Sequence, residues 1–385
     1  MPEVIELGRT PGGYTLNAAR EDETVSIQYR EFISSEDGQL FIQRLEGIPT
    51  DILNRLPQKI NPAQVDSLLA IIDGEGIAHV YINEIEQRVR VRASGPLEAG
   101  TVVTKNDIVD VDRLDFNVDI PVDVGIVFVF SVGWRKGLYY DFGPISGPEA
   151  SPREYDISAS LGQAYCHVLF QERFSISDEE WQAFFAAKWF PFVALEHDGI
   201  DTLIRHVRSG WDPDEQIDEF VNAIKDRLPK MMDSWKSHPS FLPHVEILDR
   251  AAERFQADDY VSCTALLFPR IEGILRTHHS SLGATTNPSP DNLTSTAVSS
   301  KISNEKCLLL PHRFVAYLRD IYFADFSPDS GPIGVSRHSV AHGVATASDF
   351  NKKSALIAIL VVHQLFYFLE NRSNTTESSE GDSDS

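Results

Sequence analysis

The sequence predicts an α+β protein in which a mixed α/β N-terminal region precedes an all-α helical bundle. Runs of β-branched residues dominate before residue 143, and helical periodicity dominates after residue 177. With 385 residues, the chain is longer than one hydrophobic core usually spans. We therefore expect an α/β region over 1–110, a β-hairpin and helix region over 111–205, a helical domain over 206–372 and a disordered acidic tail over 373–385.

The first region shows strand and helix patterns in alternation. Alternating or β-branched runs predict strands over Thr24–Tyr29, Ile77–Ile82 and Val89–Arg92. A helix is expected over 61–72, because Asn61 and Pro62 form a cap followed by a proline at the first helical position. Apolar residues follow at helical spacing, which supports the same expectation.

The strongest β pattern lies between residues 119 and 143. Two apolar runs, Val124–Phe130 and Leu138–Phe142, flank the segment Gly133–Gly137, so we expect a hairpin with a basic tip. Trp134 at this tip can stack on a base, and its two basic neighbours can contact phosphate. The commoner alternative is an ordinary hairpin tip without a ligand.

Helical periodicity begins at Ser177, which forms a capping box with Glu180 three residues later. Helices are expected from Ser177 to before Pro191, from about Asp214 to Leu228, over Phe241–Phe255 and over Asp258–Arg276. The last of these should kink at Pro269. The aromatic residues around Trp181 are expected in the core rather than in a ligand site.

A stretch rich in Ser and Thr over 280–300 has no apolar stripe, so we expect an exposed loop. Helical spacing returns over Asn304–Ala324, and a turn-rich segment follows over Phe326–Val335. Asp349 should cap a final apolar helix from Asn351 to about Asn371. The apolar part of this helix is too short to cross a bilayer, which predicts a core helix.

The net charge of −23 is unevenly distributed. Residues 1–249 carry −20, residues 250–372 carry +1 (12 basic minus 11 acidic residues) and residues 373–385 carry −4. Because acidic surfaces repel phosphate, broad coating of nucleic acid is excluded, whereas a local basic site in the neutral part is compatible. No secretory signal follows Met1, and the three cysteines are far apart, which predicts reduced thiols in a cytoplasmic protein.

The neutral part contains the most informative segment, Ser336–Gly343. Arg337 offers a planar fork of donors that matches a phosphate. His342, five residues later, titrates near neutrality and can take or give a proton. These two groups suit the cleavage of a phosphodiester without a metal. The alternative is structural, with Arg337 paired to Asp349 or Asp329 at a helix start and His342 as a hydrogen-bonded core histidine.

Set between helices in this order, the motif Arg337-His338-x3-His342 resembles that of the HEPN superfamily, a set of small all-helical domains marked by Arg-x(4–6)-His. The residue after Arg in that motif is typically Asn, Asp or His, and Gly343 follows as it often does in such domains. The stretch Tyr260–Arg276 is also similar to an earlier helix of bacterial members. The resemblance covers 215–372 and implies a HEPN-like helical bundle.

The resemblance implies a metal-independent endoribonuclease that cleaves RNA by attack of its 2′-OH, in phage defence or as a toxin. In that reaction Arg337 would hold the phosphate, His342 would move a proton, and His338 would be a supporting polar group. No cofactor is expected. A metal bound by His278 and His279 with the motif histidines is disfavoured, because adjacent helical residues cannot both point at one ion.

Three residues of the earlier helix are candidates for support or RNA binding, namely Arg270, Glu272 and Arg276. Glu272 is expected to hold Arg337 or a histidine. The alternative is that all three belong to the solvated side of a helix, which is the commoner place for charged residues.

Residues five apart in a helix lie about 140° apart around its axis, so Arg337 and His342 of one chain diverge. The resemblance implies that two copies of the motif face each other, which predicts a homodimer through the C-terminal helical domain. The expected partners are RNA and, at the N-terminal region, an effector or phage component. Two alternatives remain: a non-catalytic HEPN-like module that binds RNA, a nucleotide or a partner protein, and a purely structural dimerisation domain.

Overall fold

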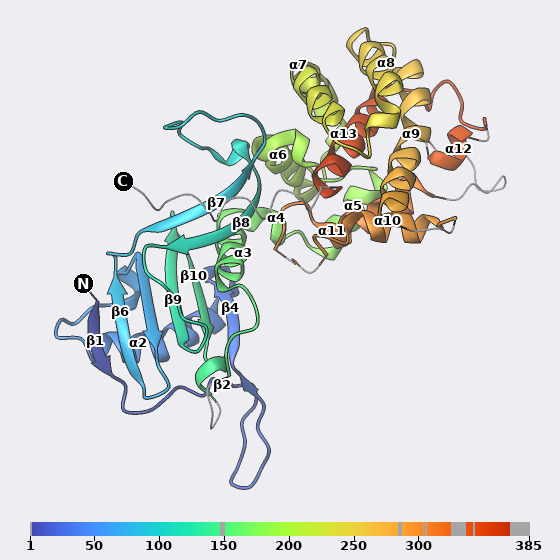
Figure 1. Cartoon of the computed structure of the whole chain (residues 1–385). Helices are drawn as coiled ribbons and strands as arrows, with labels where there is room; N and C mark the ends of the chain where they lie inside the picture. The colour runs from blue at the N-terminus through green and yellow to red at the C-terminus, as the bar shows by residue number, and fades with distance from the viewer. Residues whose placement is uncertain are drawn as a thin grey trace. The chain divides into compact units, whose positions relative to one another are not determined.

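The computed structural model describes residues 2–146, 151–283, 287–302, 304, 306–324, 336–341 and 343–369. It has the expected α+β architecture and divides into two compact units (Figure 1). The sheet unit comprises residues 1–93 and 110–174, and the helical unit comprises residues 94–109 and 175–385. These units differ from the expected divisions at 110 and 205, because strands before and after residue 110 share one sheet.

The centre of the sheet unit is a six-stranded antiparallel sheet with the order β1-β6-β5-β9-β10-β4 (Figure 1). Its strands are β1 (Glu3–Glu6), β4 (Arg30–Ser34), β5 (Ser67–Ile72), β6 (Ile77–Ile82), β9 (Gly125–Val132) and β10 (Arg135–Asp141). Two smaller ladders pair β2 (Tyr14–Thr15) with β3 (Ile27–Gln28) and β7 (Gln87–Ala93) with β8 (Ile108–Phe116). The expected hairpin is therefore present as β9 and β10.

Helices cover both faces of the six-stranded sheet. On one face, α1 (Gln39–Leu45) and α2 (Ile48–Asn54) join the core that contains Leu68. On the other face, α3 (Ile157–Leu169) joins the core that contains Phe128, and the short α4 (Gln171–Phe174) follows it. Because successive side chains of a strand point to opposite faces, the central strands β5 and β9 supply residues to both cores.

The helix expected over 61–72 is wrong. The structure has a single 3-10 turn, η2 (Pro62–Gln64), and then the strand β5, all of whose residues are buried. A central strand needs apolar side chains on both faces, so its sequence is a continuous apolar run that also satisfies helical spacing. Pairing with β6 and β9 makes this segment a strand rather than a helix. The strand expected over Thr24–Tyr29 is reduced to β3.

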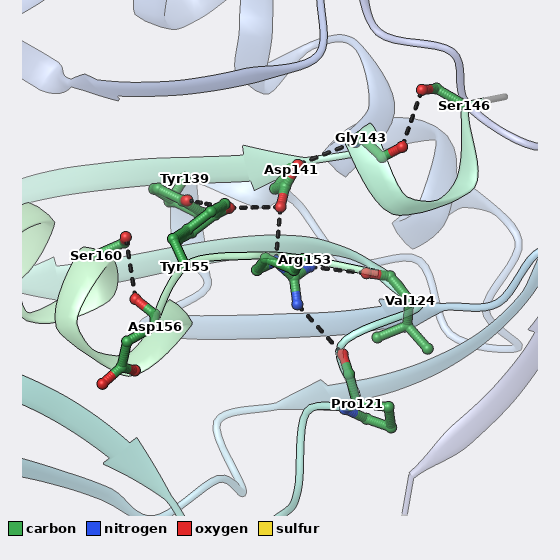
Figure 2. A network of polar contacts seen from close by, with 10 residues as sticks. All are labelled: Pro121, Val124, Tyr139, Asp141, Gly143, Ser146, Arg153, Tyr155, Asp156 and Ser160. Atoms are coloured by element: carbon green, nitrogen blue, oxygen red, sulfur yellow. Dashed lines mark hydrogen bonds and ion pairs between the residues drawn. The ribbon is translucent and has the colours of Figure 1, made fainter. Parts of the chain in front are cut away.

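A buried ion pair anchors the chain between β10 and α3 (Figure 2). Arg153 Nε donates to Asp141 Oδ2 at 2.7 Å, and the two side chains are 1% and 4% exposed. The other guanidinium nitrogens donate to the carbonyl oxygens of Pro121 and Val124, at 3.2 and 2.8 Å. The Tyr155 hydroxyl donates to the same carboxylate oxygen at 2.5 Å. Pairing and hydrogen bonding of both buried charges make this cluster a structural anchor.

The helical unit is arranged around α13 (Lys352–Phe368), which is buried along nearly its whole length (Figure 1). The helices α7 (Ile217–Lys236) and α9 (Tyr260–Ser281) pack against it. The other helices are α5 (Asp178–Ala186), α6 (Glu196–Ser209), α8 (Val245–Gln256), α10 (Pro290–Val298), α11 (Pro311–Tyr317), α12 (Arg337–Ala341) and the π-helix η8 (Leu318–Tyr322). A helix that is apolar on all sides belongs in the middle of a bundle, as α13 does.

Short 3-10 turns connect several of these elements. They are η1 (Ser35–Asp37), η3 (Lys105–Asp107), η4 (Gly143–Ile145), η5 (Val193–Leu195), η6 (Pro213–Gln216) and η7 (Leu242–His244). The turn η7 replaces the first residues of the helix expected over Phe241–Phe255, which begins as α8 at Val245.

The loop expected over 280–300 is partly wrong, because α10 occupies its second half. Ser289 caps this helix and Pro290 takes its first position, so its start follows the usual rules. Although the composition of α10 is mainly polar, the helix has a buried face that consists of Leu293, Thr294, Ala297 and Val298. Packing of α10 against α9, rather than propensity, stabilises the helix.

Two helix starts also differ from expectation. The helix expected over Asn304–Ala324 begins only at Pro311, and Asn351 rather than Asp349 caps α13. The capping box at Ser177 is present as expected. The segment 326–335 and the tail 373–385 lie outside the described residues. In the part of the chain that the structure describes, no helix combines the length and apolar character needed to cross a membrane.

Candidate active site

Glu272 is the centre of a charged cluster on α9. It is 8% exposed, and its carboxylate accepts hydrogen bonds from two guanidinium groups. Arg276, one turn later on the same helix, donates to Oε1 through Nε at 2.8 Å and approaches it through Nη2 at 2.7 Å. Arg337, 65 residues further along the chain, donates to Oε2 through Nε. Two cations on one carboxylate leave a formal charge of +1.

Arg337 reaches Glu272 because it is the first residue of α12, which packs against α9 (Figure 1). Reciprocal bonds fix the start of α12: Ser336 N–H donates to Ser339 Oγ at 2.8 Å, and Ser339 N–H donates to Ser336 Oγ at 3.2 Å. Both serines are buried. Gly343 follows the helix in the left-handed region at φ 68°, a conformation that suits glycine.

The structure places two of the three predicted catalytic residues side by side. Nδ1 of His338 lies 3.4 Å from Nη1 of Arg337, and both side chains are half-buried. Arg337 pairs with Glu272 and not with Asp349, whose carboxylate accepts from Thr346. His342 and Asp329 lie outside the described residues.

The three supporting candidates do not act as one group. Glu272 and Arg276 join the cluster, since residues four apart share a helix face. Arg270 lies on a different side of α9, where its positive charge adds to burial in lowering the pKa of His244. Arg276 also donates from Nη1 to Asn287 Oδ1 at 2.6 Å, so a second acceptor holds its guanidinium.

The sequence pattern gave no indication of the role of Tyr322, whose hydroxyl supports the backbone of Glu272. Its hydroxyl donates to the Phe268 carbonyl at 2.5 Å and accepts from the Glu272 N–H at 3.0 Å. Burial raises the pKa of this hydroxyl, so it remains a donor. Tyr322 ends the π-helix η8, a rare element that often marks functional sites. No local pattern indicates this contact across 50 residues.

The remaining candidates have structural partners. At the β9–β10 hairpin, Arg135 lies within β10 and pairs with Glu172 at 2.6 Å, whereas Trp134 is 77% exposed. The adjacent histidines diverge, with His278 at 3.5 Å from a serine hydroxyl and His279 at 3.2 Å from a threonine hydroxyl. Among the residues that the structure describes, no three His, Cys, Asp or Glu side chains gather as a metal site would require.

Comparison of the chain with protein-family models, curated proteins and solved structures gave no match. The chemistry of the cluster therefore follows from its own residues. The guanidinium of Arg337 is partly exposed, is fixed on one side by Glu272 and lies close to an imidazole, and a guanidinium is a group whose planar donors match the geometry of a phosphate.

Proposed function

We propose that the helical unit is a HEPN-type endoribonuclease that cleaves RNA without a metal, with Arg337 and His342 at its centre. The observation that supports this proposal is the cluster of Arg337 and Arg276 on the buried carboxylate of Glu272. One carboxylate orients both guanidinium groups and leaves a positive charge beside His338. This is a suitable environment for a phosphodiester, in a part of the chain with little net charge.

The proposed reaction uses the nucleophile that RNA itself carries. The 2′-oxygen attacks the phosphorus, the bond from phosphorus to the 5′-oxygen breaks, and a 2′,3′-cyclic phosphate forms. His342 takes the proton from the 2′-oxygen or delivers one to the leaving 5′-oxygen. Arg337 opposes the charge that builds on the phosphate oxygens, and His338 orients the phosphate. A second copy of the motif in a homodimer completes the site.

A cleavage assay with a matched histidine control tests this function. Full-length protein is incubated with total RNA in buffer that contains a chelator, and the RNA ends are mapped. The His342→Ala variant should keep its oligomeric state and lose cleavage by roughly 100-fold or more. His312→Ala, the same change at an exposed position of α11, should cleave as the wild type does.

The result separates catalysis from binding. If the wild-type dimer cuts no RNA but shifts it in a gel, the non-catalytic alternative replaces the enzyme. Arg337→Lys sharpens the test, because it keeps the charge and removes the planar fork. It should reduce cleavage more than it reduces RNA binding.

A further inference from the structure

A cavity in the helical unit has apolar and aromatic walls. It has a volume of about 230 Å³ and lies between α9, η8 and α13. Its walls include Phe268, Ile271, Tyr322, Ile357 and Val361. An apolar cavity of about 150 Å³ is large enough for benzene, so this one has room for a larger ring system.

The charges at the rim of this cavity balance one another. Lys353 Nζ donates to Asp214 Oδ1 at 2.5 Å and to the Ala187 carbonyl at 2.7 Å, so its charge is paired. Burial lowers the pKa of Lys188, repulsion from Lys353 adds to that effect, and attraction to Asp349 opposes it. The rim therefore presents a cation and an anion that attract each other, which favours a neutral ligand with a polar edge over an ion.

Asp349 supplies the rim with a hydrogen-bond acceptor. Its Oδ2 accepts from the backbone N–H and from the hydroxyl of Thr346, both at 2.8 Å. Its Oδ1 accepts no hydrogen bond from any residue that the structure describes. A carboxylate oxygen has two lone pairs, so Oδ1 can accept from two adjacent N–H groups. Asp349 is half-buried and the neighbouring Asn351 is exposed, so a ligand can enter the cavity from this side.

We propose that this cavity binds the base of a guanine nucleoside, with its two fused rings between the apolar walls and its N1–H and 2-amino donors at Asp349. Guanine carries these two donors next to each other and has an acceptor, O6, beside them, where the rim places Lys188. Adenine presents the lone pair of N1 at the same place, which a carboxylate repels. Bases are commonly bound in this way, between apolar or aromatic side chains with polar groups at the Watson–Crick edge.

The cavity is connected to the Arg337 cluster through Tyr322. The ring of Tyr322 lines the cavity, and its hydroxyl accepts from the backbone N–H of Glu272 at 3.0 Å. Ile271, the residue before Glu272, is part of the wall. A guanine in an RNA strand is therefore one source of the base, an assignment that rests on the proposed function. A free guanine nucleotide is the other source, and it does not require RNA cleavage.

Guanosine, inosine and adenosine, titrated into the full-length protein and followed by ligand-observed NMR, test the site. These nucleosides carry no phosphate, so an arginine that holds phosphate does not contribute to the difference between them. Guanosine should bind one site per chain, about tenfold more tightly than adenosine, because adenosine leaves a carboxylate opposite a lone pair. Inosine keeps N1–H and lacks the 2-amino group, so its affinity should lie between the other two.

Asp349→Asn tests the acceptor without removing the turn that it forms. The backbone N–H of Thr346 keeps the amide oxygen at the position of Oδ2, so the amide NH2 replaces Oδ1. This variant should keep its melting temperature and lose the preference for guanosine. Asp107→Asn is the matched control, because Asp107 Oδ2 accepts in the same way from the N–H and hydroxyl of Thr104, at 2.8 and 2.7 Å, away from this cavity. It should preserve the preference.

The comparison of nucleosides on the wild type does not depend on the folding of a variant. Equal affinity for guanosine and adenosine, or an unchanged preference in Asp349→Asn, would overturn the site. Short oligonucleotides of 2′-deoxyuridine with one central guanine or adenine distinguish the two sources and cannot be cleaved. Tighter binding of the guanine strand supports a base within a strand, whereas equal binding of the two strands supports a free nucleotide. None of these measurements uses RNA cleavage, so failure of the site and failure of the proposed ribonuclease are distinguishable.

Discussion

The shared carboxylate of Glu272 allows a quantitative prediction. Glu272→Gln removes the charge that pairs with both Arg337 and Arg276 and leaves two guanidinium groups adjacent. Arg337→Gln removes one cation and leaves Glu272 paired with Arg276. Hydrogen bonds to charged groups contribute about 1.5–3 kcal/mol when buried, and Arg337 is 29% exposed. We therefore expect the unfolding free energy to fall by about 2–3 kcal/mol for Glu272→Gln and by about 1 kcal/mol for Arg337→Gln.

A double-mutant cycle in urea measures the interaction directly. Tryptophan fluorescence reports mainly on the helical unit, which contains four of the five tryptophans. The cycle for Glu272 and Arg337 should give a coupling of about 1–2 kcal/mol. A control cycle on the exposed pair Arg250 and Glu253 of α8 should give no measurable coupling. Equal coupling in both cycles, or a larger loss for Arg337→Gln than for Glu272→Gln, would refute the proposed support.

Three further predictions concern stability. Tyr322→Phe should lower the unfolding free energy by about 2 kcal/mol and speed hydrogen exchange at the Glu272 amide; unchanged exchange would contradict the hydroxyl's role. Arg153→Met leaves a buried carboxylate unpaired, so thermal unfolding should show a loss of about 3 kcal/mol, and a neutral effect would mean the carboxylate becomes protonated. Burial lowers the pKa of His244 and His278, so the unfolded chain binds more protons. Their contribution to stability is present above about pH 6.5 and is lost below it; urea titrations should show a smaller loss on acidification after both are changed to Gln.

Several elements follow directly from local sequence. The capping box of Ser177 and Glu180 starts α5, and the apolar run from Ala355 predicts a core helix that is present as α13. The β9–β10 hairpin is also present where two apolar runs flank a turn. In each case the pattern is strong over a short stretch, so local chemistry and the fold agree.

Other elements depended on contacts between distant segments. The run from Ser67 to Ile72 satisfies both a helix and a central strand, and its pairing with β6 and β9 makes it a strand. The polar helix α10 exists because its few apolar residues pack against α9. Neither pairing partner can be identified from the periodicity of the segment itself.

For the candidate site, the sequence by itself determined the residue types: an arginine that can hold phosphate, a histidine nearby, and a glutamate one turn before Arg276. Only the tertiary structure decided that Glu272 binds Arg337 while Arg270 faces elsewhere, and that Tyr322 supports the Glu272 backbone. The physical reason is the sequence separation between the residues in contact. Helical periodicity fixes neighbours three or four residues apart, whereas contacts across 50 or 65 residues depend on how whole helices pack.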